Sequence, residues 1–309
     1  MNANIAHGVA SRYVVAMPEL PEVETVRRGL AAVMEGRPIA HVTVRRGDLR
    51  IPIPDGFAER LQGRTVTGIR RRAKYLLFDC DDGTVLIAHL GMSGRMVIDQ
   101  ADDGADGGNG RLVGHFVHDP GSAAKHEHIV FQVGNGTVVR FSDPRRFGLM
   151  TLDHVDTIDA HPLLAHLGPE PTDDSFTGAV LAGLLRGKKT PIKAALLDQR
   201  VVAGVGNIYA CEGLFRAGIS PRRTAATVQG GRAERLADAI RRVLADAIAA
   251  GGSTLRDHVA PSGEIGYFQH NFRVYGQEGK PCPTCGVGNT VRRIIQSGRS
   301  TFYCPTHQR

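Results

Sequence analysis

The chain has 309 residues, a formal net charge of +7 from 38 basic against 31 acidic residues, and 42% hydrophobic residues. This length can bury a sizeable core and favours two domains, while the basic surplus suits a polyanionic partner. No apolar run reaches the roughly 18 residues of a membrane span, and residues 1–16 lack the apolar centre of a signal peptide. We therefore expect a cytoplasmic protein, and nothing in the sequence suggests more than a monomer.

The most reactive position near the start of the chain is Pro18, which follows an internal methionine, Met17. A proline inside a chain has no amine chemistry, whereas a proline at a free N-terminus is a secondary amine that can form an iminium with an electrophilic carbon. Translation from Met17 and removal of that methionine would expose this amine beside Glu19, a ready proton donor or acceptor. Residues 1–17 would then be a mis-assigned start or an extension that must be removed.

The sequence pattern of residues 18–155 predicts one helix and several strands. Residues 21–35 are typical of a helix, because Pro21 suits its first turn, Glu22 and Glu24 suit its positive end, and apolar residues recur on one face. Strand signals follow at His41–Val44, Tyr75–Asp79, Thr84–Leu90, Ile129–Val133 and Thr137–Phe141, the last two flanking the hairpin signal Asn135-Gly136. The region predicts a helix packed on a β-sandwich. The Gly- and Asp-rich stretch 99–124 predicts a mobile surface loop.

Beyond the prolines at 161–171, helices are predicted at Ile192–Gln199, Asn207–Ala217 and Arg232–Ala250. Asn207 follows two glycines and can cap its helix while backbone N–H groups face a phosphate. Basic residues and four potential metal ligands gather in the last forty residues, the ligands in the spacing Cys282-x₂-Cys285-x₁₈-Cys304-x₂-His307. This spacing predicts a tetrahedral Cys₃His zinc site, since such pairs typically bind metal in a reducing compartment. The alternative is a three-cysteine remnant that holds metal weakly or not at all.

Ten short motifs occur in one order from Pro18 to the C-terminus. They are PELPEVET (18–25), RRAKYLLF (71–78), HLGMSGR (89–95), KHEH (125–128), DPRRFG (143–148), HLGPEP (166–171), KKTPIK (188–193), GVGNIYA (204–210), GYF (266–268) and RSTFYC (299–304). Through these motifs the sequence resembles the bacterial formamidopyrimidine-DNA glycosylases, which remove oxidised purines such as 8-oxoguanine. The resemblance implies an α+β fold with an N-terminal β-sandwich and flanking helix (18–155), a helix-two-turn-helix domain (170–262), and a lesion-capping loop with a β-hairpin zinc finger (263–309).

The resemblance also implies a partner, a metal and a reaction. The partner is double-stranded DNA containing oxidised purines or abasic sites, and the metal is one structural Zn²⁺. Pro18 would attack C1′ of a nucleotide flipped out of the duplex and displace its base, leaving a Schiff base from which both flanking phosphates are eliminated. Glu19 would be the proton donor and Lys74 would contact phosphate and serve β-elimination. Arg299 would grip the flanking phosphates in δ-elimination, through its charge, because an arginine does not readily lose a proton.

Further residues are assigned to the DNA surface by the same resemblance. Met92, Arg145 and Phe147 would fill the space left by the flipped nucleotide, because apolar wedges offset lost stacking and an arginine can pair with the orphaned base. Contacts with DNA are implied for His89, His126, Arg145, Lys188 and Asn207. An isolated methionine, phenylalanine or histidine is by default a packed structural residue, so these assignments depend on the motifs. Residues 263–268 match a loop that closes over an everted base, the alternative being an ordinary glycine-rich connector.

The metal site departs from the family's pattern, because His307 stands where a fourth cysteine is usual. Imidazole is neutral, so the site would carry one less negative charge and would lose metal more readily at low pH.

Two other functions stay open. If the first sixteen residues stay attached, Pro18 is an amide and the chain would be a non-catalytic damaged-DNA-binding protein. An oxidised-pyrimidine glycosylase of the endonuclease VIII type is the nearest enzymatic alternative, although that group lacks DPRRFG. The sequence leaves the preferred lesion and opposite base, the true start and the role of residues 99–124 undetermined.

Overall fold

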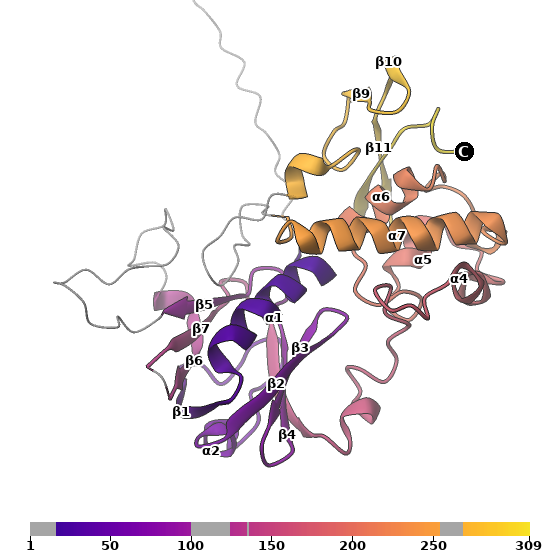
Figure 1. Ribbon diagram of the computed structural model, residues 1–309. Coiled ribbons are helices and arrows are strands. Elements are labelled where there is room, and N and C mark those ends of the chain that lie inside the picture. The colour runs from indigo at the N-terminus through magenta and orange to yellow at the C-terminus, as the bar shows by residue number, and fades with distance from the viewer. Residues whose placement is uncertain (1–16, 100–123, 135, 254–267) are drawn as a thin grey trace, which may run out of the picture.

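The computed structural model describes residues 17–99, 124–134, 136–253 and 268–309 (Figure 1). The expectations for the extension 1–16, for the loop 99–124 apart from its two end residues, and for residues 263–267 of the capping loop lie outside the described residues.

The N-terminal half combines a helix, α1 (Leu20–Met34), with eight antiparallel strands. These are β1 (Arg37–Val44), β2 (Thr65–Arg72), β3 (Tyr75–Cys80), β4 (Thr84–His89), β5 (Arg95–Asp99), β6 (Glu127–Val133), β7 (Val138–Ser142) and β8 (Leu149–His154), and the short helix α2 (Phe57–Leu61) lies between β1 and β2. The strand order is β5-β7-β6-β1-β2-β3-β4-β8. Strand β1 joins two half-sheets, because Arg37 and Pro38 pair with β2 whereas the residues from Ile39 onward pair with β6.

Both half-sheets bury side chains in one core, which α1 also enters. Ile69 and Phe78 come from one half-sheet, Phe131 and Phe141 come from the other, and Leu30 comes from α1. The predicted α+β class is thus confirmed. The predicted helix and the hairpin between β6 and β7 are confirmed as well, and the strand predicted from His41 begins earlier.

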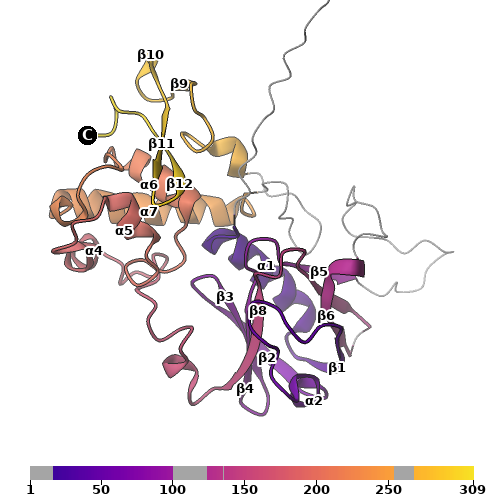
Figure 2. The ribbon, with the colours of Figure 1, turned by 180° about the vertical axis from the view of Figure 1, so that it is seen from behind.

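The second half is helical and contains α4 (Gly178–Leu185), α5 (Ile192–Leu197), α6 (Asn207–Arg216) and α7 (Gly231–Ala249). The last three match the predicted helices, whereas α4 was not predicted. Helix α7 lies beside α1, which brings the two halves together (Figures 1 and 2). Among the described residues, no helix is long and apolar enough to cross a membrane.

The C-terminal residues form two small hairpins on the helical half. Strands β9 (Pro281–Cys282) and β10 (Gly286–Thr290) pair, as do β11 (Arg292–Gln296) and β12 (Arg299–Tyr303), and β12 lies against α6 (Figure 2). Val291, Phe302 and Cys304 belong to the same buried core as the helices. The hairpins therefore share their core with α6 and α7, and the domain limits expected from the sequence stay predictions.

Candidate active site

The residue before α1 connects the two halves of the molecule. Glu19 is 3% exposed, and its carboxylate accepts backbone N–H groups of Gly206 (2.9 Å), Ile208 (2.8 Å) and Tyr209 (3.3 Å) at the start of α6. A side chain at Gly206 would prevent this contact, because its Cβ would lie 2.3 Å from the Glu19 carboxyl carbon. The glycines of GVGNIYA therefore let α1 approach α6 closely.

The surroundings of Glu19 suit proton transfer. Burial raises the pKa of this carboxyl to about 7, although Lys74 and the N–H groups of α6 act in the opposite direction. Near neutral pH the carboxyl is therefore divided between its protonated and ionised forms. A group with this property can donate a proton to a leaving base.

These contacts correct the predicted role of Asn207 as a helix cap. The cap residue is Gly206, and the amides expected to face a phosphate bind Glu19 instead. The Asn207 Nδ2 donates to the Ser300 carbonyl (3.0 Å) and lies 3.4 Å from the Tyr275 hydroxyl, so this side chain ties α6 to β12. Its Oδ1 is buried without a hydrogen-bond partner among the described residues. The contact of Asn207 with DNA stays a prediction.

Glu22 and Glu24 also differ from the prediction that they merely favour the helix dipole. Glu22 is buried, and its carboxylate accepts the Tyr209 hydroxyl (2.7 Å) and both the N–H and the hydroxyl of Ser253 (2.8 Å each). Glu24 is buried too and pairs with Arg71 at 3.1 Å. Both acids therefore bind groups far away in the sequence.

Lys74 is buried beside Glu19, at the turn between β2 and β3. The side chain is 6% exposed, and burial lowers its pKa; the charge of Arg299 acts in the same direction and that of Glu19 opposes it. The structure thus brings together three residues that lie more than 50 positions apart in the sequence.

Glu170, from the segment that links the two halves, holds the turn that carries Lys74. Ala73 has a positive φ of 54°, and its N–H donates to the Glu170 carboxylate. The same carboxylate accepts Arg71 (2.7 Å) and Arg72 (3.0 Å). Arg71 and Arg72, which precede Lys74, are consequently paired with an acid instead of only being hydrated by solvent.

His89 is neutral and has a defined tautomer. Burial lowers its pKa to about 3, and its ring lies 4.9 Å from that of Tyr75 across β3 and β4. The Nδ1 atom accepts the Gly91 N–H at 2.9 Å, so the ring hydrogen resides on Nε2. His89 can therefore donate from Nε2 to an acceptor such as a phosphate oxygen.

Arg299 is the first residue of β12 and directly follows the turn from β11. Ser297 and Gly298 both have positive φ (48° and 71°), as a tight two-residue hairpin requires, and Arg299 pairs with Gln296. Arg299 is exposed, yet its charge acts on the buried Lys74. The hairpin therefore extends a cation toward the site from the C-terminal end of the chain.

Lys193 is a buried cation that the sequence analysis missed. It is fully buried on α5, its Nζ lies 3.4 Å from the Ser300 carbonyl, and burial lowers its pKa. The charges of Glu19 and Arg299 both act on it. The available signal was a lysine inside the apolar sequence Ile192-Lys193-Ala194-Ala195, because a lysine is rarely fully buried on an apolar helix face unless it has a partner.

Two turns hold the three residues predicted to intercalate. Met92 is half-buried in the turn after β4, whereas Arg145 and Phe147 are exposed on residues 143–148, here called the wedge loop. The Arg145 guanidinium carbon lies 4.9 Å from the centre of the Phe147 ring. The two turns meet backbone to backbone, because a Cβ on Gly91 would lie 2.3 Å from the Phe147 carbonyl carbon. Their intercalation stays a prediction.

Asp143 fixes the shape of the wedge loop. Its carboxylate is fully buried and accepts the Ser93 hydroxyl (2.5 Å) and the Gly148 N–H (2.7 Å). Arg146, within the loop, has a positive φ of 56° that is uncommon for a residue with a side chain. Buried hydrogen bonds on both sides of Arg146 hold this conformation.

Two predicted DNA contacts lie outside this group. His126 is in a short 3₁₀ turn, where its carbonyl accepts the Asp143 N–H at 3.0 Å, so it adjoins the wedge loop. Lys188 lies in the loop between α4 and α5, and within the described part of the chain no hydrogen bond or ion pair joins it to Glu19 or Lys74. Both roles stay predictions.

The predicted metal ligands are assembled in part. The sulfur atoms of Cys282, Cys285 and Cys304 lie within 4.8 Å of one another, which fits three corners of a tetrahedral thiolate site, and His307 is not part of this group. The His307 Nε2 lies 3.0 Å from the Phe215 carbonyl, so Nε2 carries the hydrogen and Nδ1 is the nitrogen left for a metal.

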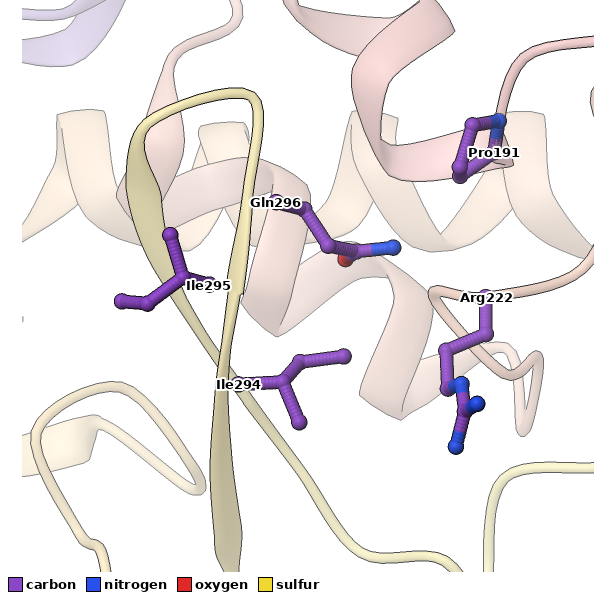
Figure 3. A pocket seen from close by; sticks show the side chains of 5 residues that line it. All are labelled: Pro191, Arg222, Ile294, Ile295 and Gln296. Atoms are coloured by element: carbon purple, nitrogen blue, oxygen red, sulfur yellow. The ribbon is translucent and has the colours of Figure 1, made fainter.

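A surface cavity of about 380 Å³ adjoins the other strand of the Arg299 hairpin (Figure 3). Its described lining is Pro191, Arg222, Ile294, Ile295 and Gln296. None of these is a predicted site residue, so the cavity is separate from the group around Glu19.

Comparison with known proteins identifies the family. Residues 17–150 match the model of the formamidopyrimidine-DNA glycosylase N-terminal domain, and residues 167–259 match that of the formamidopyrimidine-DNA glycosylase H2TH domain. A relative from Chelativorans sp. (strain BNC1), named formamidopyrimidine-DNA glycosylase, is 54% identical over 303 residues, which cover 95% of this chain and all of the relative. The chain belongs to the formamidopyrimidine-DNA glycosylase family.

Solved structures of formamidopyrimidine-DNA glycosylases have the same fold. The MutM (Fpg) protein of Thermus thermophilus is 39% identical with a TM-score of 0.78, over 94% of this chain and 98% of that one. A mutant Lactococcus lactis Fpg, solved with DNA containing Fapy-dG, is 33% identical with a TM-score of 0.80, over 94% of this chain and all of that one. The family assignment made from the ten motifs is confirmed.

Proposed function

We propose that this formamidopyrimidine-DNA glycosylase is a bifunctional DNA glycosylase and AP lyase that excises oxidised purines, 8-oxoguanine and formamidopyrimidines, from double-stranded DNA in base-excision repair. The observation that carries the proposal is the group of Glu19, Lys74 and Arg299, in which Glu19 directly follows Pro18 in the chain. A carboxyl with a pKa near 7, a buried lysine and an exposed arginine act on one another there. Lactococcus lactis Fpg structures with Fapy-dG DNA and with abasic-site DNA support the choice of partner.

The reaction begins at Pro18, and we propose that the active chain starts at this residue. The secondary amine attacks C1′ of the flipped nucleotide, the bond from C1′ to the base breaks, and the protonated Glu19 supplies a proton that the departing base requires. The nitrogen then loses its proton and the bond from C1′ to the ring oxygen O4′ breaks, so that O4′ takes up a proton and an iminium forms at C1′, which acidifies the hydrogens on C2′. Removal of a C2′ proton expels the 3′ phosphate, and a second elimination expels the 5′ phosphate.

Of the other residues, Lys74 and Arg299 serve the eliminations, and the rest bind and orient the DNA. Burial lowers the pKa of Lys74, so this ammonium releases a proton more readily than an exposed lysine, which suits a proton-transfer role in β-elimination. Arg299 stabilises the charge of the leaving phosphate. Met92, Arg145 and Phe147 occupy the space of the flipped nucleotide, while His89, His126, Lys188 and Asn207 contact phosphates.

We further propose that Cys282, Cys285, Cys304 and the Nδ1 of His307 hold one structural Zn²⁺. When bound, this ion supplies a rigid cross-link that holds the two hairpins, and with them Arg299, in place.

Intact-mass measurement tests the proposal. The protein is expressed from its native start and incubated with an 8-oxoguanine duplex, with and without borohydride. We expect a chain that begins at Pro18 and gains a covalent DNA adduct only when borohydride reduces the Schiff base. A chain that retains Met1 and forms no adduct would overturn the catalytic proposal for that form and support the damaged-DNA-binding protein instead.

An oxidised-pyrimidine substrate is the second candidate. A Lactococcus lactis Fpg was solved with DNA containing an oxidised pyrimidine, at 32% identity and a TM-score of 0.78. Competition between an 8-oxoguanine:cytosine duplex and a thymine glycol duplex separates the candidates. We expect the purine duplex to be processed first, and the reverse order would favour the pyrimidine activity.

A further inference from the structure

The segment between β1 and α2 lies directly against the wedge loop. The Arg50 N–H donates to the carbonyl of Gly148, the last residue of that loop, at 3.0 Å. The Leu49 N–H donates to the Ile51 carbonyl at 3.1 Å, and the buried Leu49 side chain belongs to the N-terminal core. Backbone contacts and the burial of Leu49 therefore fix the position of Arg50, and its own side chain is not needed for this.

The arginines around Arg50 each have an acidic partner, whereas Arg50 has none among the described residues. Arg45 pairs with Glu127 at 3.2 Å, whereas Arg46 and Arg146 both pair with Asp48, at 2.8 and 3.4 Å. Arg50 is exposed, and its guanidinium has no acidic partner or hydrogen bond within the described residues. A cation held in place beside paired cations, without a partner of its own, is suited to bind an external anion.

The guanidinium of Arg50 lies within electrostatic reach of the strand ends next to Lys74. Its positive charge acts on both Tyr75 and His89, which adjoin Lys74 at the ends of β3 and β4. His89 is neutral and its Nε2–H is a donor. Arg50 and Lys74 thus both act on His89, and the backbone of Arg50 contacts the end of the wedge loop.

We propose that Arg50 binds a backbone phosphate of the DNA strand that carries the lesion, adjacent to the phosphate contacted by His89. This inference rests on the proposed function, because it requires damaged DNA to bind with its displaced nucleotide between the wedge loop and Glu19. A guanidinium can donate two parallel hydrogen bonds to a phosphate, which fixes orientation as well as charge. Arg50 positions the backbone and takes no part in the covalent steps.

The salt dependence of DNA binding tests this inference. Affinity for a duplex with a tetrahydrofuran abasic analogue is measured between low and moderate salt for the wild type and Arg50→Gln. Each phosphate contact contributes about 0.9 to the slope of log affinity against log salt, so the slope should shrink by about that amount. We expect about tenfold weaker binding at low salt, as for loss of one charged hydrogen bond.

Two further variants separate a phosphate contact from a general effect of charge. Arg50→Lys keeps a cation and should restore most of the slope. Arg64→Gln is the matched control, because Arg64 pairs with Asp82 at 3.1 Å just before the start of β2. The eight residues of β2 span about 26 Å from that end to the Lys74 turn. An unchanged slope in Arg50→Gln, or an equal loss in Arg64→Gln, would overturn the inference.

Replacing single phosphates by neutral methylphosphonates identifies the strand and position. The difference between wild type and Arg50→Gln should vanish when one particular phosphate beside the lesion is neutral, and only on the lesion strand. Disappearance of the difference on the opposite strand would contradict the proposed location. A wild-type protein that does not bind the abasic duplex at all would instead refute the proposed function itself.

Discussion

At the scale of single residues, Glu19 shows how opposing effects set the protonation of one carboxyl. Three backbone N–H groups at a helix start and the charge of Lys74 favour the anion, and by themselves they would lower the pKa. Burial acts against them and prevails, so the pKa rises to about 7. Adjacency to Pro18 was enough to select this residue from the sequence. Its pKa was not predictable, because the groups that bury it come from α6, almost 190 positions later.

The rate of base release should depend on this carboxyl. We expect release from an 8-oxoguanine duplex at saturating enzyme to fall as the pH rises through about 7, because ionised Glu19 has no proton to donate. Glu19→Gln should release the base about 10²–10⁴-fold more slowly and without this fall. Cleavage of a preformed abasic site is the control, since no base departs there. A wild-type rate that is level across neutral pH would contradict the assignment.

The same carboxyl should make stability depend on pH. Its pKa in the folded protein is above the ordinary value of 4.5, so the fold favours the protonated form. The stabilisation is complete below about 4.5 and is lost as the pH rises through about 7. We expect the Tm of the wild type to fall more than that of Glu19→Gln between these limits, as calorimetry would measure. Parallel curves for the two proteins would show that Glu19 is not the titrating group.

At the scale of elements, the sequence predicted those whose apolar residues lie close together along the chain. Strands β3, β4, β6 and β7 and helices α1, α5, α6 and α7 have clear apolar patterns and were found. Strand β2 was missed because it ends in three arginines, two of which have partners 47 and 98 positions away, Glu24 and Glu170. Strand β8 lies at the sheet edge and ends in polar residues. The long-range ion pairs of the β2 arginines leave no signal in the local sequence.

The turn between β2 and β3 should depend on Glu170. Glu170→Gln removes the anion shared by Arg71, Arg72 and the Ala73 N–H, and leaves a largely buried cation without a full partner. We expect a loss of about 3 kcal/mol in the free energy of unfolding by urea, as is typical for broken buried pairs. Under conditions where the variant is folded, borohydride-trapped adduct should form more slowly while affinity for abasic DNA changes little. Equal losses of trapping and affinity would argue against a specific effect on Lys74.

At the scale of the whole molecule, the C-terminal hairpins are an extension of the helical core. Val291 and Phe302 are buried with α6 and α7, and Asn207 connects α6 to β12. The sequence identified the cysteines through their spacing. It could not show that the His307 ring faces the Phe215 carbonyl, because this depends on how the tail packs on α6.

Removal of metal should therefore affect more than the hairpins. We expect a chelator to lower the Tm of the protein in a single transition, because the hairpins and helices share one core. His307→Ala should hold zinc more weakly than the wild type, and His307→Cys should bind it at least as well, as a zinc-competition assay would measure. Full zinc content and unchanged affinity in His307→Ala would exclude His307 as a ligand.

The contact between Glu19 and the first amides of α6 has a consequence for how the protein can be divided. Glu19 lies near the start of the chain and its N–H partners follow 187 and 189 positions later, so neither half alone contains the whole candidate site. Cutting the chain in the linker ahead of Glu170 would create a split enzyme whose fragments are inactive singly. Base excision would return only on reassociation, and would thus report complementation between the two halves.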